Sequence, residues 1–111
     1  MKILIVDDDQ GCRDFWTEML TSLGHDVVVA KDGVEGVSVY RRGDFDFVVS
    51  DYQMPKMNGV LMLMEIRKVA PAQKMVLASG DPPKMPAELA GVPVLLKGTI
   101  RRKDVEALLA K

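Results

Sequence analysis

The stretch ILIVDDD, residues 3–9, decides the fold class. Its first four residues form a continuous apolar run, which is typical of a strand buried on both faces of a parallel sheet. Three aspartates follow directly, where such a strand reaches the edge at which open α/β sheets bind their ligands. The stretch therefore predicts an α/β protein with an acidic site at one edge of the sheet.

Short apolar runs continue to alternate with stretches of helical spacing along the chain. Such alternation implies parallel strands joined by right-handed crossovers. Further strands are expected at residues 27–30, 47–49, 75–78 and 92–96, and a last helix at residues 100–111.

Three polar residues mark the expected starts of helices. Asp32 and Asn58 are expected to cap the second and third helices. Asp9 either caps the first helix or joins a metal site, and the cap is the favoured interpretation. Cys12 lies on the apolar face of the first helix, where a core position is expected.

Length and composition fit a single globular domain. The chain has 111 residues, of which 48% are hydrophobic and 28% charged, and its net charge is −1. A nucleic-acid-binding protein would normally carry a basic field. No apolar run approaches the ~20 residues needed to cross a bilayer, and the N-terminus lacks the apolar stretch of a signal peptide. We expect a cytoplasmic protein that contacts neither nucleic acid nor membrane.

Polar residues follow four of the predicted strands. Because the carboxyl ends of parallel strands share one edge, these residues are expected to converge. Crowded carboxylates repel one another unless a cation joins them, and oxygen ligands of this kind suit Mg²⁺ or Mn²⁺. A lysine and a hydroxyl beside an aspartate nucleophile complete a site for phosphoryl transfer. The converging residues are Asp7, Asp8, Asp51, Ser79 and Lys97.

Four motifs in this order resemble the receiver domain of two-component response regulators, in particular the single-domain chemotaxis type. The motifs are residues 3–8 with Arg13 downstream, 51–59, 77–80 and 95–97. The resemblance covers residues 1–111 as a single domain with no output domain. It implies a flavodoxin-like (βα)5 doubly wound parallel sheet of strand order 2-1-3-4-5.

The resemblance also implies a role for each site residue. Asp51 would accept the phosphoryl group, Ser79 would bind one of its oxygens, and Lys97 would pair with Asp51. The metal, Mg²⁺ or Mn²⁺, would be held by Asp8, by Asp7 directly or through water, by Asp51, and by the backbone carbonyl of Gln53.

The family further implies a partner and a working cycle. The phosphoryl donor would be a sensor histidine kinase or a phosphotransfer protein, and phosphorylation would control binding to an output protein that the sequence does not identify. Such a domain speeds its own phosphorylation and dephosphorylation without being a conventional enzyme. It is either a free-standing regulator, which Met1 directly before the first strand favours, or the receiver of a longer regulator or hybrid kinase.

A phosphatase of the haloacid dehalogenase type is the alternative from another class. In that interpretation Asp7 would be the nucleophile and a small phosphoester the substrate. The alternative leaves residues 51–59 unexplained, and it needs a longer chain with a cap.

Three features depart from the family pattern, all of them between Ser79 and Gly98. Gly98 follows Lys97 where the family usually has proline, so a trans peptide bond is expected there. Val94 stands where many members carry an aromatic switch residue. The segment between Ser79 and Lys97 is short and contains four prolines, so the fourth helix, near residues 87–90, is expected to be little more than one turn.

The third helix raises the question of self-association. Met62, Leu63, Ile66 and Val69 are expected to face the sheet. Leu61 and Met64 either form an exposed apolar patch, which would suit a weak homodimer or a partner, or fold onto the core.

Overall fold

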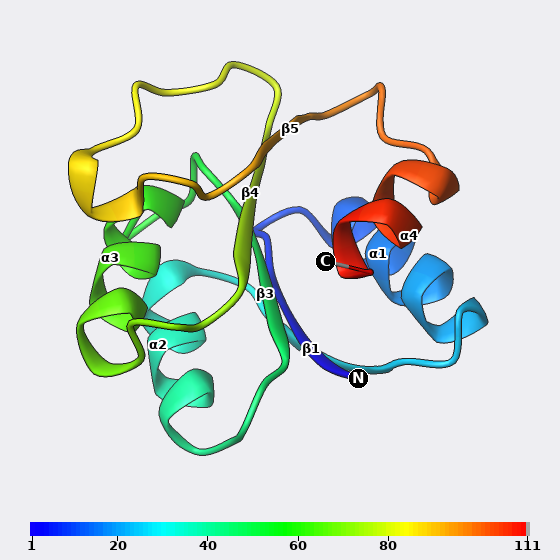
Figure 1. Cartoon of the computed structure of the whole chain (residues 1–111), viewed down its shortest axis with the longest axis horizontal. Coiled ribbons are helices and arrows are strands. Elements are labelled where there is room, and N and C mark those ends of the chain that lie inside the picture. Colours follow the sequence, from blue (N-terminus) through cyan, green and yellow to red (C-terminus); the bar gives the residue numbers. More distant parts are fainter. Residues whose placement is uncertain (111) are drawn as a thin grey trace.

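The computed structural model describes residues 1–110, which form one five-stranded parallel sheet with helices on both faces (Figure 1). Helices α2 and α3 cover one face, and α1 and α4 cover the other. The strand order β2-β1-β3-β4-β5 confirms the predicted order 2-1-3-4-5. The elements are β1 (Lys2–Val6), α1 (Gln10–Ser22), β2 (Asp26–Ala30), α2 (Gly33–Arg41), β3 (Phe47–Asp51), α3 (Gly59–Val69), β4 (Met75–Ser79), η1 (Ala87–Leu89), β5 (Val94–Leu96) and α4 (Arg102–Leu109).

The central strands carry two apolar clusters, one on each face of the sheet. Alternate residues of β1 point to opposite faces, so that Leu4 packs with the α3 side and Ile5 with the α1 side. Trp16 and Leu20 of α1 and Val105 of α4 complete the second cluster. Both faces of the sheet are therefore buried in its middle, as the continuous apolar run of β1 predicts.

Side chains cap the first three helices as the sequence predicts. The carboxylates of Asp9 and Asp32 accept hydrogen bonds from the backbone N–H groups of Cys12 and Glu35, at 2.9 and 2.8 Å. The amide oxygen of Asn58 accepts from the N–H of Leu61 at 2.9 Å. These caps satisfy donors that have no partner inside the helix.

The carboxyl-terminal third differs from the expectation in its boundaries. The fourth connection holds only the short 3₁₀ helix η1, which confirms the shortened fourth helix. Strand β5 begins at Val94 rather than at residue 92, since Pro93 lacks the N–H that would extend the pairing. Helix α4 covers residues 102–109 rather than 100–111, and residue 111 lies outside the described residues.

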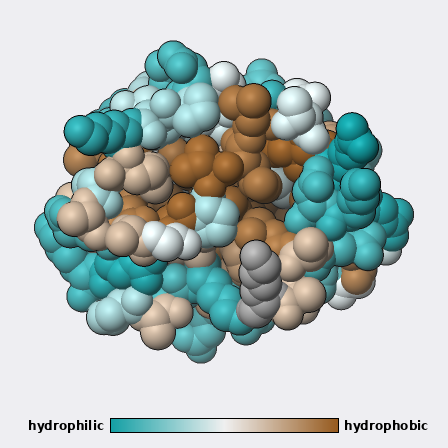
Figure 2. Space-filling view, turned by 45° about the horizontal axis from the view of Figure 1, so that its top comes forward, coloured by the Kyte–Doolittle hydropathy of each residue, from teal (hydrophilic) through white to brown (hydrophobic). Residues whose placement is uncertain are grey.

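The short fourth connection leaves the β5 edge partly open. Leu96 is 46% exposed. Figure 2 shows hydrophobic surface in the middle of the face that β5 and its flanking loops form, with hydrophilic residues around it. A parallel sheet normally has both faces covered by helices, so this exposure follows from the loss of a full fourth helix.

Helix α3 only partly follows the predicted faces. Met62, Leu63 and Ile66 are buried, but Val69 is 61% exposed, so its predicted position against the sheet is wrong. Val69 is the last residue of α3, and helical spacing does not show where a helix extends beyond the sheet that it covers. Leu61 is exposed whereas Met64 packs against the core, so the two do not form the patch that was one of the alternatives.

None of the helices in residues 1–110 has the length and apolar character needed to span a membrane. The peptide bond between Lys97 and Gly98 is trans, as expected.

Candidate functional site

Strand register brings the predicted site residues to one edge of the sheet. Val6 pairs with Ser50, Asp51 with Ala78, and Ser79 with Leu96. The carboxyl ends of these strands therefore lie side by side at one edge of the sheet. Asp51 and Ser79 are the last residues of β3 and β4, and Asp7 and Lys97 directly follow β1 and β5. The sequence assigned these four residues to one site.

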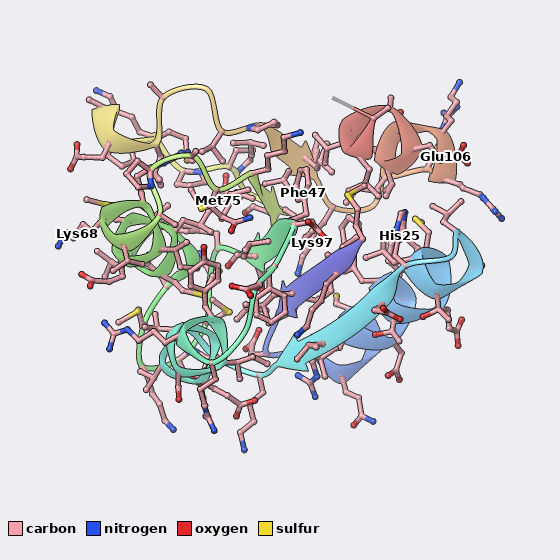
Figure 3. All side chains as sticks on the ribbon, turned by 60° about the horizontal axis from the view of Figure 1, so that its bottom comes forward. His25, Phe47, Lys68, Met75, Lys97 and Glu106 are labelled. Carbon is pink, nitrogen blue, oxygen red and sulfur yellow. The ribbon has the colours of Figure 1, made fainter. Side chains whose placement is uncertain are left out.

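Lys97 links two carboxylates from different strands. Its Nζ lies 2.9 Å from Oδ2 of Asp7 and 3.1 Å from Oδ1 of Asp51. The side chain of Asp7 is buried, and that of Asp51 is 11% exposed. In Figure 3, Lys97 lies in the middle of the view among the strands, whereas Lys68 and Glu106 lie at its margin on α3 and α4. Lys97 is thus a positive charge inside the site.

Asp7 is held by several hydrogen bonds. Its Oδ1 accepts from the N–H of Asp9 at 3.0 Å, and its backbone carbonyl accepts from the guanidinium of Arg13 at 2.7 Å. The contacts with Asp9 and Lys97 fix the orientation of the carboxylate, and the contact with Arg13 holds the backbone of Asp7. Arg13, which follows the first of the four motifs, thus lies at the pocket.

The electrostatics of the site favour an additional cation. Burial, and next the negative charge of Asp7, raise the pKa of Asp51 above its usual value, although Lys97 acts against this. Burial alone would lower the pKa of Lys97, but its hydrogen bonds to Asp7 and Asp51 hold that pKa above the usual value. Lys97 supplies one positive charge beside the two carboxylates of Asp7 and Asp51, so a metal ion could balance the charge that remains.

A divalent metal fits the donor set. One carboxylate oxygen from each of Asp7, Asp8 and Asp51 can be chosen so that all three lie within 4.8 Å of one another. Asp8 is exposed, and it lines an open pocket of about 490 Å³ with Gln53 and Asn58. Three hard oxygen donors beside an open pocket suit Mg²⁺, which usually retains several waters.

Ser79 lies at the same edge but engages its own loop. Its hydroxyl donates to the carbonyl of Asp81 at 2.9 Å and accepts from the N–H of Asp81 at 3.2 Å. The side chain is buried. The sequence predicted the position of Ser79, but not this local pairing.

Cys12 differs from the expectation of a core position. It is half-buried and lines a cavity beside Lys97, with its Sγ 3.7 Å from the ammonium nitrogen. Burial raises the pKa of the thiol to about 11. Cys12 therefore borders the site as a neutral group.

The charge of Asp51 predicts a pH-dependent stability. Because the folded-state pKa of Asp51 is raised, the ionised carboxylate destabilises the fold, and this cost grows as the pH rises above its usual pKa of 3.8. We expect Asp51→Asn to have a larger free energy of unfolding than the wild type at pH 7, and the difference to shrink as the pH falls toward 3.8. Urea unfolding of both proteins across this range is the measurement. Equal stabilities at pH 7 would contradict the prediction.

Comparison with known proteins identifies the family. The model of the response regulator receiver domain family matches residues 3–90. The chain belongs to this family. The match includes the acidic strand end, Asp51 and Ser79, and it leaves the phosphatase alternative without support.

Curated relatives of the receiver domain include both transcriptional and chemotaxis regulators. The chain is 40% identical over 75 residues to the transcriptional regulatory protein GlrR of Escherichia coli K12, covering 68% of this chain and 17% of that protein. It is 44% identical over 68 residues to the chemotaxis protein CheY-3 of Vibrio cholerae, covering 60% of this chain and 52% of that protein. The chain therefore spans a small part of GlrR and about half of CheY-3.

Solved structures show the same fold over nearly the whole receiver domain. The response regulator TrrA of Thermotoga maritima, in complex with Mg²⁺ and BeF, has a TM-score of 0.86 at 25% identity, covering 96% of this chain and 97% of that one. TrrA in complex with the histidine kinase ThkA has a TM-score of 0.83 at 26% identity, covering 97% of each chain.

Proposed function

We propose that this receiver domain accepts a phosphoryl group on Asp51, with a bound Mg²⁺ or Mn²⁺, and so carries a signal from a sensor histidine kinase or phosphotransfer protein. The observation that carries the proposal is the position of the Lys97 ammonium between Asp7 and Asp51, at the pocket that Asp8 and Gln53 line. A fixed positive charge beside Asp51 would stabilise the charge that develops on a transferring phosphoryl group.

The contacts of Asp51 suggest which oxygen attacks. The N–H of Tyr52 donates to Oδ1 at 2.8 Å, and Lys97 also pairs with Oδ1. Among the described residues, Oδ2 is thus the oxygen that is not held by these partners. Oδ2 would form the new bond to phosphorus, while the bond from phosphorus to the donor breaks and the donor group leaves with its electron pair.

The other residues would act on the phosphoryl oxygens and the metal. Asp7, Asp8, Asp51 and the Gln53 carbonyl would hold the ion, which neutralises charge on the transferring group when bound. Lys97 would shift its pairing from Asp51 to a phosphoryl oxygen. Ser79 would turn from its own loop to donate to another oxygen, which would move the Asp81 backbone that it now holds.

The proposed cycle also has a return step and partners. Water attacking phosphorus at the same pocket would release inorganic phosphate and restore the Asp51 carboxylate. The complex of TrrA with a histidine kinase supports a kinase donor for this chain. The output partner would recognise the phosphorylated form, and the site of action would be the cytoplasm.

Metal binding can be tested separately from phosphorylation. Asp8→Asn should raise the dissociation constant for Mg²⁺ by about tenfold or more, since even outer partners of metal ligands contribute 10–100-fold. Calorimetric titration of the unphosphorylated protein with MgCl₂ measures this. Asp14→Asn, a change of an exposed acid on α1, is the matched control and should bind as the wild type does. The assignment would be contradicted if both variants lost affinity equally, or if neither lost any.

A further inference from the structure

The loop between β3 and α3, residues 52–58, contains a strained turn at Lys56. The φ of Lys56 is 70°, and no other non-glycine residue in 1–110 has a positive φ. The N–H of Met57 donates to the carbonyl of Pro55 at 2.8 Å, which makes Lys56 the centre of a γ-turn of the rarer, positive-φ form. Such a conformation persists only where its surroundings hold it.

Both ends of this loop are fixed to the phosphoacceptor strand and to α3. The N–H of Gly59 donates to the carbonyl of Tyr52 at 2.7 Å, and Asn58 caps α3. The strained turn lies between these ends. Only Met54 and Pro55 separate it from Gln53, and the fixed φ of Pro55 makes that link stiff.

Helix α2 supports the turn from outside the site. A Cβ added at Gly33, the first residue of α2, would overlap the carbonyl oxygen of Met57 and lie 2.8 Å from the Cβ of Met57. Beside it, Oδ2 of Asp32 lies 3.6 Å from Nζ of Lys56, while Oδ1 of Asp32 caps α2. Asp32 is buried and Lys56 is exposed, and the buried carboxylate lies within ion-pair distance of the turn. The start of α2 therefore contacts the turn by close backbone packing and by charge.

We propose that Asp32 and Gly33 are positioning residues for the metal site. They hold the turn at Lys56, and through it the carbonyl of Gln53, in the shape that binds a divalent cation. They act through the loop, since their contacts are with Lys56 and Met57. This inference rests on the proposed function of the pocket.

A general loosening of α2 is the competing explanation, and the same helix offers a matched control. A Cβ at Gly36 would lie 2.6 Å from Sδ of Met62 and 3.0 Å from Val6. Gly36→Ala therefore disturbs the packing of α2 against α3 and β1 without adding an atom beside the loop. Gly33→Ala disturbs the loop itself.

The test is a titration of the folded, unphosphorylated protein with MgCl₂, monitored by ¹H–¹⁵N NMR. Gly33→Ala should raise the Mg²⁺ dissociation constant by about tenfold, as loss of an outer-shell support does, and should shift the amide signals of Met57 and Gly59 before any metal is added. Gly36→Ala should bind Mg²⁺ as the wild type does. Equal weakening in both variants would overturn the proposal in favour of general loosening.

Asp32→Ala is a second variant, which adds no atom that could overlap the loop. It tests the positioning role if Gly33→Ala does not fold. It should weaken Mg²⁺ binding in the same direction, because it removes both the cap of α2 and the partner of Lys56. Wild-type affinity in Asp32→Ala and in any folded Gly33→Ala would overturn the positioning role while leaving the metal site intact. The proposed function would fail as well if the wild type bound no Mg²⁺, or if its affinity for Mg²⁺ were the same as that of Asp51→Asn.

Discussion

Replacement of Lys97 by methionine is expected to slow phosphorylation of Asp51 by roughly 100-fold or more, the usual effect of losing one preorganised group that stabilises charge in a transition state. The ammonium lies within 3.1 Å of Asp51 and 2.9 Å of Asp7. Methionine keeps an unbranched apolar side chain that is only one atom shorter, but it removes the charge. Asp7 and Asp51 would then repel each other without compensation, which would raise the pKa of Asp51 further and reduce the attacking carboxylate.

The rate of labelling by acetyl phosphate with MgCl₂ measures this effect. Lys68→Met is the matched control, because Lys68 is an exposed lysine on α3 that pairs only with Glu65 among the described residues. We expect the control to keep the wild-type rate. A rate in Lys97→Met within a few-fold of the wild type would show that Lys97 is a structural ion-pair partner and no more.

Gly59→Ala is expected to destabilise the fold by about 3 kcal/mol or more, at the upper end of the cost of overpacking. A Cβ at Gly59 would overlap the carbonyl oxygen of Asp51 and lie 2.8 Å from Oγ of Ser50. The overlap is with backbone of a central strand, which cannot move aside as a flexible side chain can. Helix α3 would have to shift away from the phosphoacceptor strand.

Urea denaturation gives the free energy of unfolding for this comparison. Gly80→Ala is the control, because a Cβ at Gly80 would meet no heavy atom within 4 Å and its φ is not positive. Similar stabilities for the two variants would contradict the close approach of α3 to Asp51.

The positions of the site residues were predictable because these residues stand at strand ends. The apolar run at residues 3–6 is too short for a helix and fits a strand with both faces covered, so the acids that follow it are expected at the sheet edge. The same reasoning places Asp51 and Lys97, and the structure brings these residues within ion-pair distance. Cap residues such as Asn58 were predictable for a similar reason, since an oxygen on a short side chain can accept a hydrogen bond from an unpaired backbone N–H at the start of a helix.

Other features depend on contacts between segments far apart in the sequence. Nothing near Gly59 shows that a strand carbonyl lies against it, and nothing near Arg13 shows that it reaches the Asp7 carbonyl. The exposure of Val69 depends on where α3 ends relative to the sheet, which helical spacing does not encode. A preference for glycine at residue 33 was likewise hidden, because its reason is the loop at Met57.

Phosphorylation of the wild type and Asp51→Asn by acetyl phosphate is the most direct test of the central claim. Intact-protein mass spectrometry should show one added phosphoryl group on the wild type with MgCl₂, loss of that group once the donor is removed, and no addition when EDTA replaces the metal. Peptide mapping should place the group on Asp51, and Asp51→Asn should stay unmodified. Labelling that persists in Asp51→Asn, or that is equally fast without a divalent metal, would contradict the account.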